Sequence, residues 1–162
     1  MRSKEIRLYN VIFPIWMLWF IPATWILILP ANFVIDFAVL FFTLKYLKVE
    51  ERGQIAKKCI LRVWICGFLA DIIGSIFMFL PILLDVDAGF VNSIAMNPFE
   101  SIWAMIYTTI ALMIAGGCIY LFNLKFCLNN SGLATAQKKK VALVLAVITA
   151  PYLYYLPTAW FY

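Results

Sequence analysis

The stretch LRVWICGFLADIIGSIFMFL, residues 61–80, decides the fold of this chain. It is apolar from Val63 onward except for one carboxylate, Asp71, near its middle. About 20 helical residues rise about 30 Å, which is the thickness of the hydrocarbon core of a bilayer. The stretch therefore predicts a membrane-spanning helix that carries a carboxylate at mid-depth.

The composition of the whole chain also indicates a membrane protein. Of its 162 residues, 65% are hydrophobic and 13% are charged. Soluble domains are about 45–50% apolar and about 25% charged, so we expect lipid to solvate much of this chain. The formal net charge of +5 comes from basic residues at the ends of apolar runs. That placement argues against nucleic-acid binding.

The positions of the basic residues predict a topology. All thirteen Lys and Arg residues fall within residues 2–7, 45–62 and 125–140, and none lies in the acidic connection 81–101. Because cytoplasmic loops carry an excess of Lys and Arg, we expect an all-α bundle of five spans in one domain, with the N-terminus inside and the C-terminus outside. The expected helices are about 11–29, 33–47, 61–80, 98–124 and 137–156.

The first apolar segment is the hardest to divide. Residues 11–47 are too long for one span and contain three prolines. The sequence Leu29-Pro30-Ala31-Asn32 predicts a tight turn in which Asn32 caps the second helix. A re-entrant hairpin that returns to the cytoplasmic side satisfies the charges equally and stays open as an alternative. At the other end of the chain, residues 152–162 predict an aromatic belt at the outer interface.

Polar and small residues share one face on each of three predicted helices, at spacings of three, four or seven. They are Asn32, Asp36 and Thr43 on the second helix, Gly67, Asp71, Gly74 and Ser75 on the third, and Thr109, Gly116 and Asn123 on the fourth. One interpretation is helix packing, in which glycines allow close approach and polar groups hydrogen-bond between helices. The other is an ion or ligand site in a polar interior.

The two intramembrane aspartates receive different interpretations. A carboxylate at mid-span costs roughly 2.5–3.5 kcal/mol on insertion scales, so Asp71 should face protein or trapped water and is the main candidate to carry a proton or cation. Asp36 lies one turn into its predicted helix, near the outer surface. There the helix N-terminal dipole favours a carboxylate, so we expect a structural role.

Known catalytic patterns are absent from the sequence. The chain has no histidine, and Gly67-Phe-Leu-Ala-Asp71 lacks the Gly-x-Gly-Asp signature of intramembrane aspartyl proteases. No nucleophile pair, phosphate-binding loop or metal-ligand spacing is present. We therefore expect no enzyme activity, no metal and no cofactor. The four cysteines, which we expect to be free thiols near the cytoplasmic side, are Cys59, Cys66, Cys118 and Cys127.

Two short segments carry resemblances to known proteins. Residues 67–75, GFLADIIGS, resemble a segment of the five- to six-span rod-shape membrane proteins of bacteria, which act as scaffold partners. Residues 13–16, FPIW, and 29–33, LPANF, are similar to a set of uncharacterised small membrane proteins of Gram-positive bacteria. The second resemblance implies a multi-pass protein of the bacterial plasma membrane and carries no activity.

Two functions compete on these grounds. One is a small transporter or channel component with a polar path past Asp71. The other is a non-catalytic membrane scaffold, partner or immunity protein, with a second copy of the chain among its possible partners. In either case Lys138, Lys139 and Lys140 lie beside a span. They should anchor the topology and attract anionic lipid head groups at the cytoplasmic face.

Overall fold

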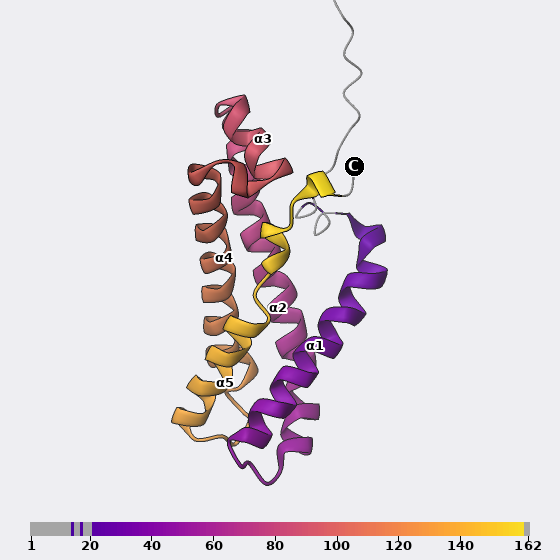
Figure 1. Cartoon of the computed structure of the whole chain (residues 1–162). Coiled ribbons are helices and arrows are strands. Elements are labelled where there is room, and N and C mark those ends of the chain that lie inside the picture. The colour runs from indigo at the N-terminus through magenta and orange to yellow at the C-terminus, as the bar shows by residue number, and fades with distance from the viewer. Residues whose placement is uncertain (1–13, 15–16, 18–20, 161–162) are drawn as a thin grey trace, which may run out of the picture.

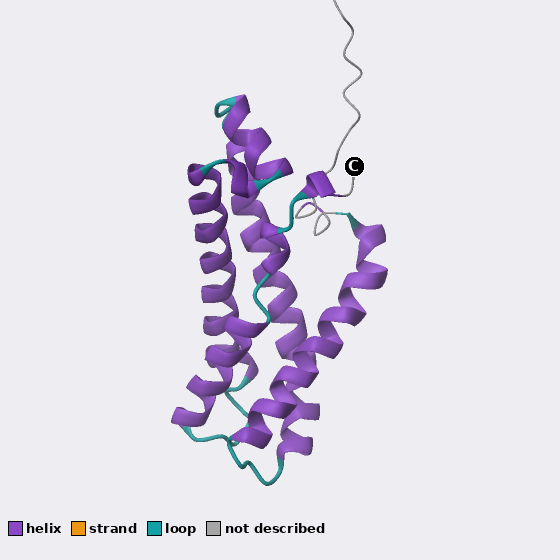
Figure 2. Ribbon diagram, viewed as in Figure 1, coloured by secondary structure: helices purple, strands orange, loops and turns teal. Residues whose placement is uncertain are grey.

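The computed structural model describes residues 14, 17 and 21–160 of the 162, and within that part the chain is all-helical (Figure 2). Three helices of the described part are long and apolar enough to cross a membrane: Pro22–Tyr46, Arg52–Leu83 and Ile102–Cys127. They pack side by side as a bundle (Figure 1). The structure thus agrees with the sequence on a helical, membrane-compatible architecture.

Helix α1, Trp25–Tyr46, follows a short 3-10 turn, η2 (Pro22–Thr24), and continues through Pro30. The tight turn predicted at residues 29–32 is therefore wrong. A proline inside a helix removes one backbone hydrogen bond, whereas a turn in lipid would leave several backbone groups without partners. Of the predicted helix at residues 11–29, the structure describes residues 14, 17 and 21–29, and residues 25–29 form the first part of α1 and not a separate helix. The alternative hairpin has no turn at residues 29–32 for the same reason, and the rest of this segment lies outside the described residues.

The segment of α1 around Pro30 is tied to the next helix. The indole Nε1 of Trp64 donates a hydrogen bond of 2.8 Å to the Leu29 carbonyl. The ring of Trp64 also meets that of Phe33 edge-on, with 5.6 Å between the centroids. These contacts stabilise α1 at the point where its own hydrogen bonding is weakest.

Helix α2, Arg52–Leu83, contains the stretch quoted above and is longer than predicted. Its 32 residues rise about 48 Å, which exceeds the hydrocarbon core of about 30 Å. The extra length is the basic N-terminal part between Arg52 and Arg62, which continues the helix beyond the apolar stretch. A short connection, residues 47–51, joins it to α1.

The acidic connection folds at the opposite end of the bundle from the basic loops (Figure 1). It contains α3, Ala88–Met96, and the 3-10 turn η3, Pro98–Glu100. The Asp87 carboxylate caps α3 by accepting a hydrogen bond of 3.0 Å from the Phe90 amide. Helix α4, Ile102–Phe122, then returns along the bundle and ends in a π-helical turn, η4 (Asn123–Cys127).

The last predicted helix, 137–156, is broken in the structure. Helix α5 covers Thr135–Ile148, and two 3-10 turns follow, η5 (Tyr152–Tyr155) and η6 (Thr158–Trp160). Pro151 has no N–H and restricts the residue before it, which ends the α-helical hydrogen bonding. The chain nevertheless continues beyond α5 toward the end that holds α3, and η6 contacts α3 (Figure 1).

Two buried clusters hold the bundle together. One lies toward the basic loops and includes Leu40, Val63, Ile119 and Leu145. The other lies toward the acidic connection and packs α2 and α4 around Tyr154. Outside these clusters many large apolar side chains are exposed, among them Ile26, Leu83 and Trp103. This exposed apolar surface is what a lipid-embedded bundle requires.

Close packing at Gly74 gives a first prediction. A Cβ atom there would lie 2.5 Å from the Tyr154 hydroxyl and 2.9 Å from the Ala115 Cβ. We expect Gly74→Ala to lower the free energy of unfolding by about 1–3 kcal/mol through overpacking. The measurement is an SDS titration of the reconstituted protein, followed by far-UV circular dichroism.

The matched control is Gly117→Ala on α4, because a Cβ atom there meets nothing within 4 Å. That change should be neutral or stabilising by up to about 1 kcal/mol, the helix-propensity difference between glycine and alanine. Equal stability of the two variants would contradict the packing described for Gly74.

Candidate functional site

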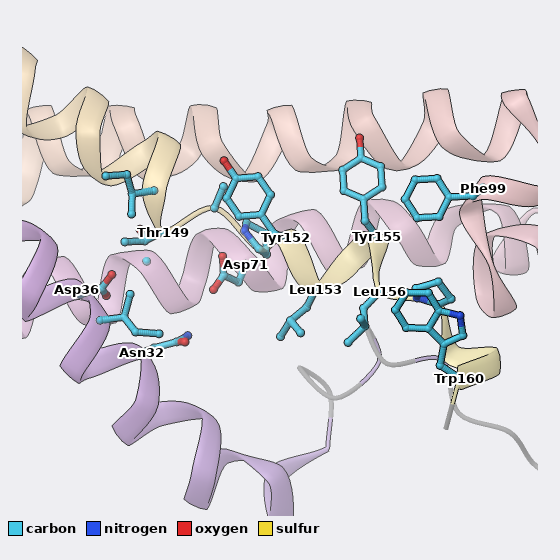
Figure 3. A pocket seen from close by; sticks show the side chains of 16 residues that line it. Asn32, Asp36, Asp71, Phe99, Thr149, Tyr152, Leu153, Tyr155, Leu156 and Trp160 are labelled. Carbon is cyan, nitrogen blue, oxygen red and sulfur yellow. The ribbon is translucent and has the colours of Figure 1, made fainter. Parts of the chain in front are cut away.

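A cavity of about 500 Å³ lies among α1, α2, η3 and the segment that follows α5 (Figure 3). Asn32 and Asp36 line it from α1, and Gly67 and Asp71 from α2. The irregular chain after Ile148 forms most of the remaining wall. Polar side chains therefore meet apolar ones in one partly open cavity between the helices.

Asp71 is the most unusual residue of this cavity. Its side chain is 4% exposed, and among the described residues its Oδ1 atom has no hydrogen-bond partner. An unsatisfied buried polar atom costs about 1–3 kcal/mol, and such atoms are rare enough in native proteins to require a specific explanation. Asp71 also lines the cavity, so a carboxyl group that is not fully satisfied by the described chain lies beside this space.

Asp36 lies beside Asp71 and is 5% exposed. The sequence placed it one turn into a helix near the outer surface, and that placement is wrong because α1 begins at Trp25. Asp36 is instead near the middle of α1, where its carboxyl group lies close enough to Asp71 to interact electrostatically. Figure 3 shows both carboxyl groups at the same end of the cavity.

Gly67 is the residue that permits this approach. A Cβ atom at Gly67 would lie 3.3 Å from the Asp36 Oδ2 atom, closer than most side chains tolerate. The other two glycines predicted to pack helices also lie at close contacts, Gly74 against Tyr154 and Gly116 against the Ala146 carbonyl, the latter at 3.4 Å. Each of the three glycines thus adjoins a different neighbouring segment of the bundle.

The broken end of α5 contributes a hydroxyl group. Thr149 Oγ1 donates a hydrogen bond of 2.9 Å to the Leu145 carbonyl and lies close enough to the Asp36 carboxyl group to interact with it. A hydroxyl has a single proton to donate. A protonated Asp36 can therefore donate to Thr149, whereas an ionised Asp36 requires the hydroxyl to turn away from Leu145.

Tyr154 supports the site from behind and was not singled out in the sequence. Its hydroxyl donates a hydrogen bond of 2.6 Å to the backbone carbonyl of Asp71 and lies 3.2 Å from Ser75 Oγ. The side chain is 1% exposed, so it belongs to the core and not to an interfacial belt. The available signal was the pair of prolines, Pro151 and Pro157, which bracket the tyrosines and interrupt a helix.

Four of the predicted polar residues lie away from the cavity. Thr43 donates to the Val39 carbonyl at 2.6 Å, and Ser75 meets Tyr154 as described. Thr109, which the sequence placed on the polar face of the fourth predicted helix, is hydrogen-bonded to the Tyr155 hydroxyl at 2.6 Å. Asn123 begins the π-helical turn, donates to the Ile119 carbonyl at 2.8 Å and belongs to the basic end of the bundle.

The lysine triplet and the cysteines that we expect near the cytoplasmic face lie within the described residues. Lys138 donates a hydrogen bond of 2.7 Å to the Asn129 carbonyl, while Lys139 and Lys140 are exposed in the first turns of α5. All four cysteines are free, and Cys66 lies near Cys127.

Of the predicted polar residues and glycines, the structure joins Asn32, Asp36, Gly67 and Asp71 into one site.

Comparison of the chain with protein families, with curated proteins and with solved structures found no match. The resemblances noted for residues 13–16, 29–33 and 67–75 therefore stay predictions.

The support that Tyr154 gives to α2 can be measured. We expect Tyr154→Phe to lower the free energy of unfolding by about 0.6–1.7 kcal/mol, the range measured for hydrogen bonds within membrane proteins. Tyr152→Phe is the matched control, because its hydroxyl donates to the Val147 carbonyl from a side chain that is 52% exposed. A larger loss in the Tyr152 variant than in the Tyr154 variant would contradict this account.

Proposed function

We propose that this chain is a small transporter or channel component whose polar path passes Asp71. One observation carries the proposal: a carboxyl group that is buried among membrane-compatible helices, with one oxygen lacking a hydrogen-bond partner in the described chain, lines a cavity together with Asp36. Ionisable groups at this depth are costly and mark ion or substrate pathways by default. If Asp71 served only to pack helices together, we would expect that oxygen to have a hydrogen-bond partner.

The interruption after α5 supports the same function. Irregular backbone at membrane depth is tolerated only where it is buried in protein or lines a cavity. Here Thr149, Ala150 and Pro151 lie between α5 and η5 and line the cavity. Discontinuous helices with unwound backbone at the substrate or ion site are common in secondary transporters, and this part of the support is analogy.

For the orientation, we propose that the basic loops face the cytoplasm of a bacterium and that the acidic connection faces outward. The segment from α5 to η6 would then cross the plasma membrane as a broken helix, ending outside. Five spans with an inner N-terminus are part of this proposal for the whole chain. Lys139 and Lys140, both exposed, would contact anionic lipid head groups, at about 1 kcal/mol for each charge.

The orientation has a direct test. A reporter fused after Tyr162 should be extracytoplasmic, and one inserted at Gly53 should be cytoplasmic, because the positive-inside rule places Arg52–Arg62 inside. The measurement is the activity of a reporter that folds on only one side of the membrane. A cytoplasmic C-terminus would contradict the proposed orientation.

The transport function is tested by Asp71→Asn in proteoliposomes. Asparagine keeps the shape of the side chain but removes the charge and the titration. The variant should fold, shown by gel filtration and far-UV circular dichroism, and should lose proton or sodium flux by at least about tenfold, equivalent to about 1.4 kcal/mol. Flux is followed with a trapped pH-sensitive or sodium-sensitive dye under an imposed gradient.

Asp85→Asn is the matched control. Asp85 lies in the exposed acidic connection at φ 50°, a conformation that asparagine adopts readily. It should leave the flux unchanged. Normal flux in a folded Asp71→Asn variant, or no flux in the unaltered protein, would reject the carrier function and favour the non-catalytic scaffold, partner or immunity role.

A further inference from the structure

The cavity has two chemically different ends. Asn32, Asp36 and Asp71 lie at one end, and Leu153, Leu156 and Trp160 extend toward the other (Figure 3). The separation follows from the fold, because the acids lie on α1 and α2 whereas the apolar residues follow the irregular chain through η5 to η6. A molecule that fills the cavity therefore meets carboxyl groups at one end and an apolar wall along the rest of its length.

In the described part of the chain, the acidic end has no basic residue of its own. The ten Lys and Arg residues that the structure describes lie within residues 45–62 and 125–140, and none of them lines the cavity. A buried charge is stable only when it is paired or hydrogen-bonded. The two carboxyl groups thus favour a ligand that brings a positive charge and hydrogen-bond donors.

A bare divalent metal ion does not fit this site. Ca²⁺, for example, takes six to eight oxygen ligands, and Mg²⁺ needs an octahedral set. Within the described part of the chain, no group of three or more His, Cys, Asp or Glu side chains could hold a metal ion. The tyrosine hydroxyls are engaged elsewhere, that of Tyr152 with the Val147 carbonyl and that of Tyr155 with Thr109.

The size and wall of the cavity suit an organic molecule. Its volume of about 500 Å³ falls in the range of about 300–1,000 Å³ that is typical of small-molecule sites. The rings of Phe99 and Tyr155 stack with their centroids 5.9 Å apart and form a firm part of the apolar wall. Aromatic and aliphatic side chains of this kind bind alkyl or aryl groups and also tolerate a nearby cation.

We propose that this cavity binds a lipophilic amine. Its protonated nitrogen lies between Asp36 and Asp71 and donates hydrogen bonds to their carboxyl groups, and its apolar chain runs along Leu153, Leu156 and Trp160. The inference rests on the proposed function, because it names the class of molecule that the path past Asp71 would carry.

The test compares three labelled probes on the full chain in lipid nanodiscs, by equilibrium dialysis against protein-free nanodiscs. Octylammonium supplies both the charge and the chain, methylammonium only the charge, and 1-octanol only the chain. Octylammonium should bind saturably, methylammonium should bind at least about tenfold more weakly, and 1-octanol should show no saturable excess.

Equal affinities of the two ammonium probes would indicate a small-cation site and overturn the inference. Saturable 1-octanol binding as tight as that of octylammonium would indicate a lipid site and also overturn it.

Two substitutions locate the probe. Asp71→Asn should weaken octylammonium binding at least about tenfold, while the control Asp85→Asn leaves it unchanged. Leu156→Trp keeps both carboxyl groups but fills the apolar end, so it should weaken octylammonium and not methylammonium. This second variant decides the matter if Asp71→Asn does not fold. Octylammonium binding that Leu156→Trp leaves unchanged would overturn the placement of the chain.

Binding and flux separate this inference from the proposed function. Asp71-dependent flux of protons or sodium without saturable octylammonium binding would overturn the inference and leave the transporter in place. Octylammonium binding that depends on Asp71, without any flux in the unaltered protein, would retain the amine site and overturn transport.

Discussion

The constraint on which this structure depends is that backbone polar groups in lipid must find partners within the protein. It explains why α1 continues through Pro30, where a turn would have exposed more groups than one proline removes. It also explains how α5 can end inside the bundle. Pro151 has no N–H to donate to the Val147 carbonyl, and the Tyr152 hydroxyl donates to that carbonyl instead.

The same constraint shapes the surroundings of Asp71. Its backbone carbonyl accepts a hydrogen bond from the hydroxyl of Tyr154 in η5, and the Ser75 hydroxyl lies next to that of Tyr154. Its carboxyl group instead lines the cavity and leaves Oδ1 without a partner among the described residues. The hydrogen bonds of Tyr154 therefore hold α2 in place through the Asp71 backbone and leave the Asp71 carboxyl group to the cavity.

The sequence alone was sufficient to predict a helical, membrane-compatible fold and the burial of Asp71, because residues 61–80 combine membrane length with one carboxylate near their middle. It was insufficient for the pairing of Asp71 with Asp36. Pro30 and Asn32 fit a capped turn and a continuous helix equally well. Only the start of α1 at Trp25 places Asp36 near the middle of that helix. Tyr154 was missed because tyrosines near an end of a membrane protein resemble an interfacial belt, and its burial depends on the break that Pro151 imposes.

The position of Thr149 links the charge of Asp36 to the hydrogen bonding at the end of α5. Besides the hydroxyl, the Leu145 carbonyl accepts the backbone N–H of Thr149 at 2.9 Å. When the hydroxyl turns toward an ionised Asp36, the last turn of α5 therefore keeps its own hydrogen bond. The Thr149 hydroxyl can therefore change its acceptor from the Leu145 carbonyl to an ionised Asp36 carboxylate without loss of backbone hydrogen bonding at the end of α5.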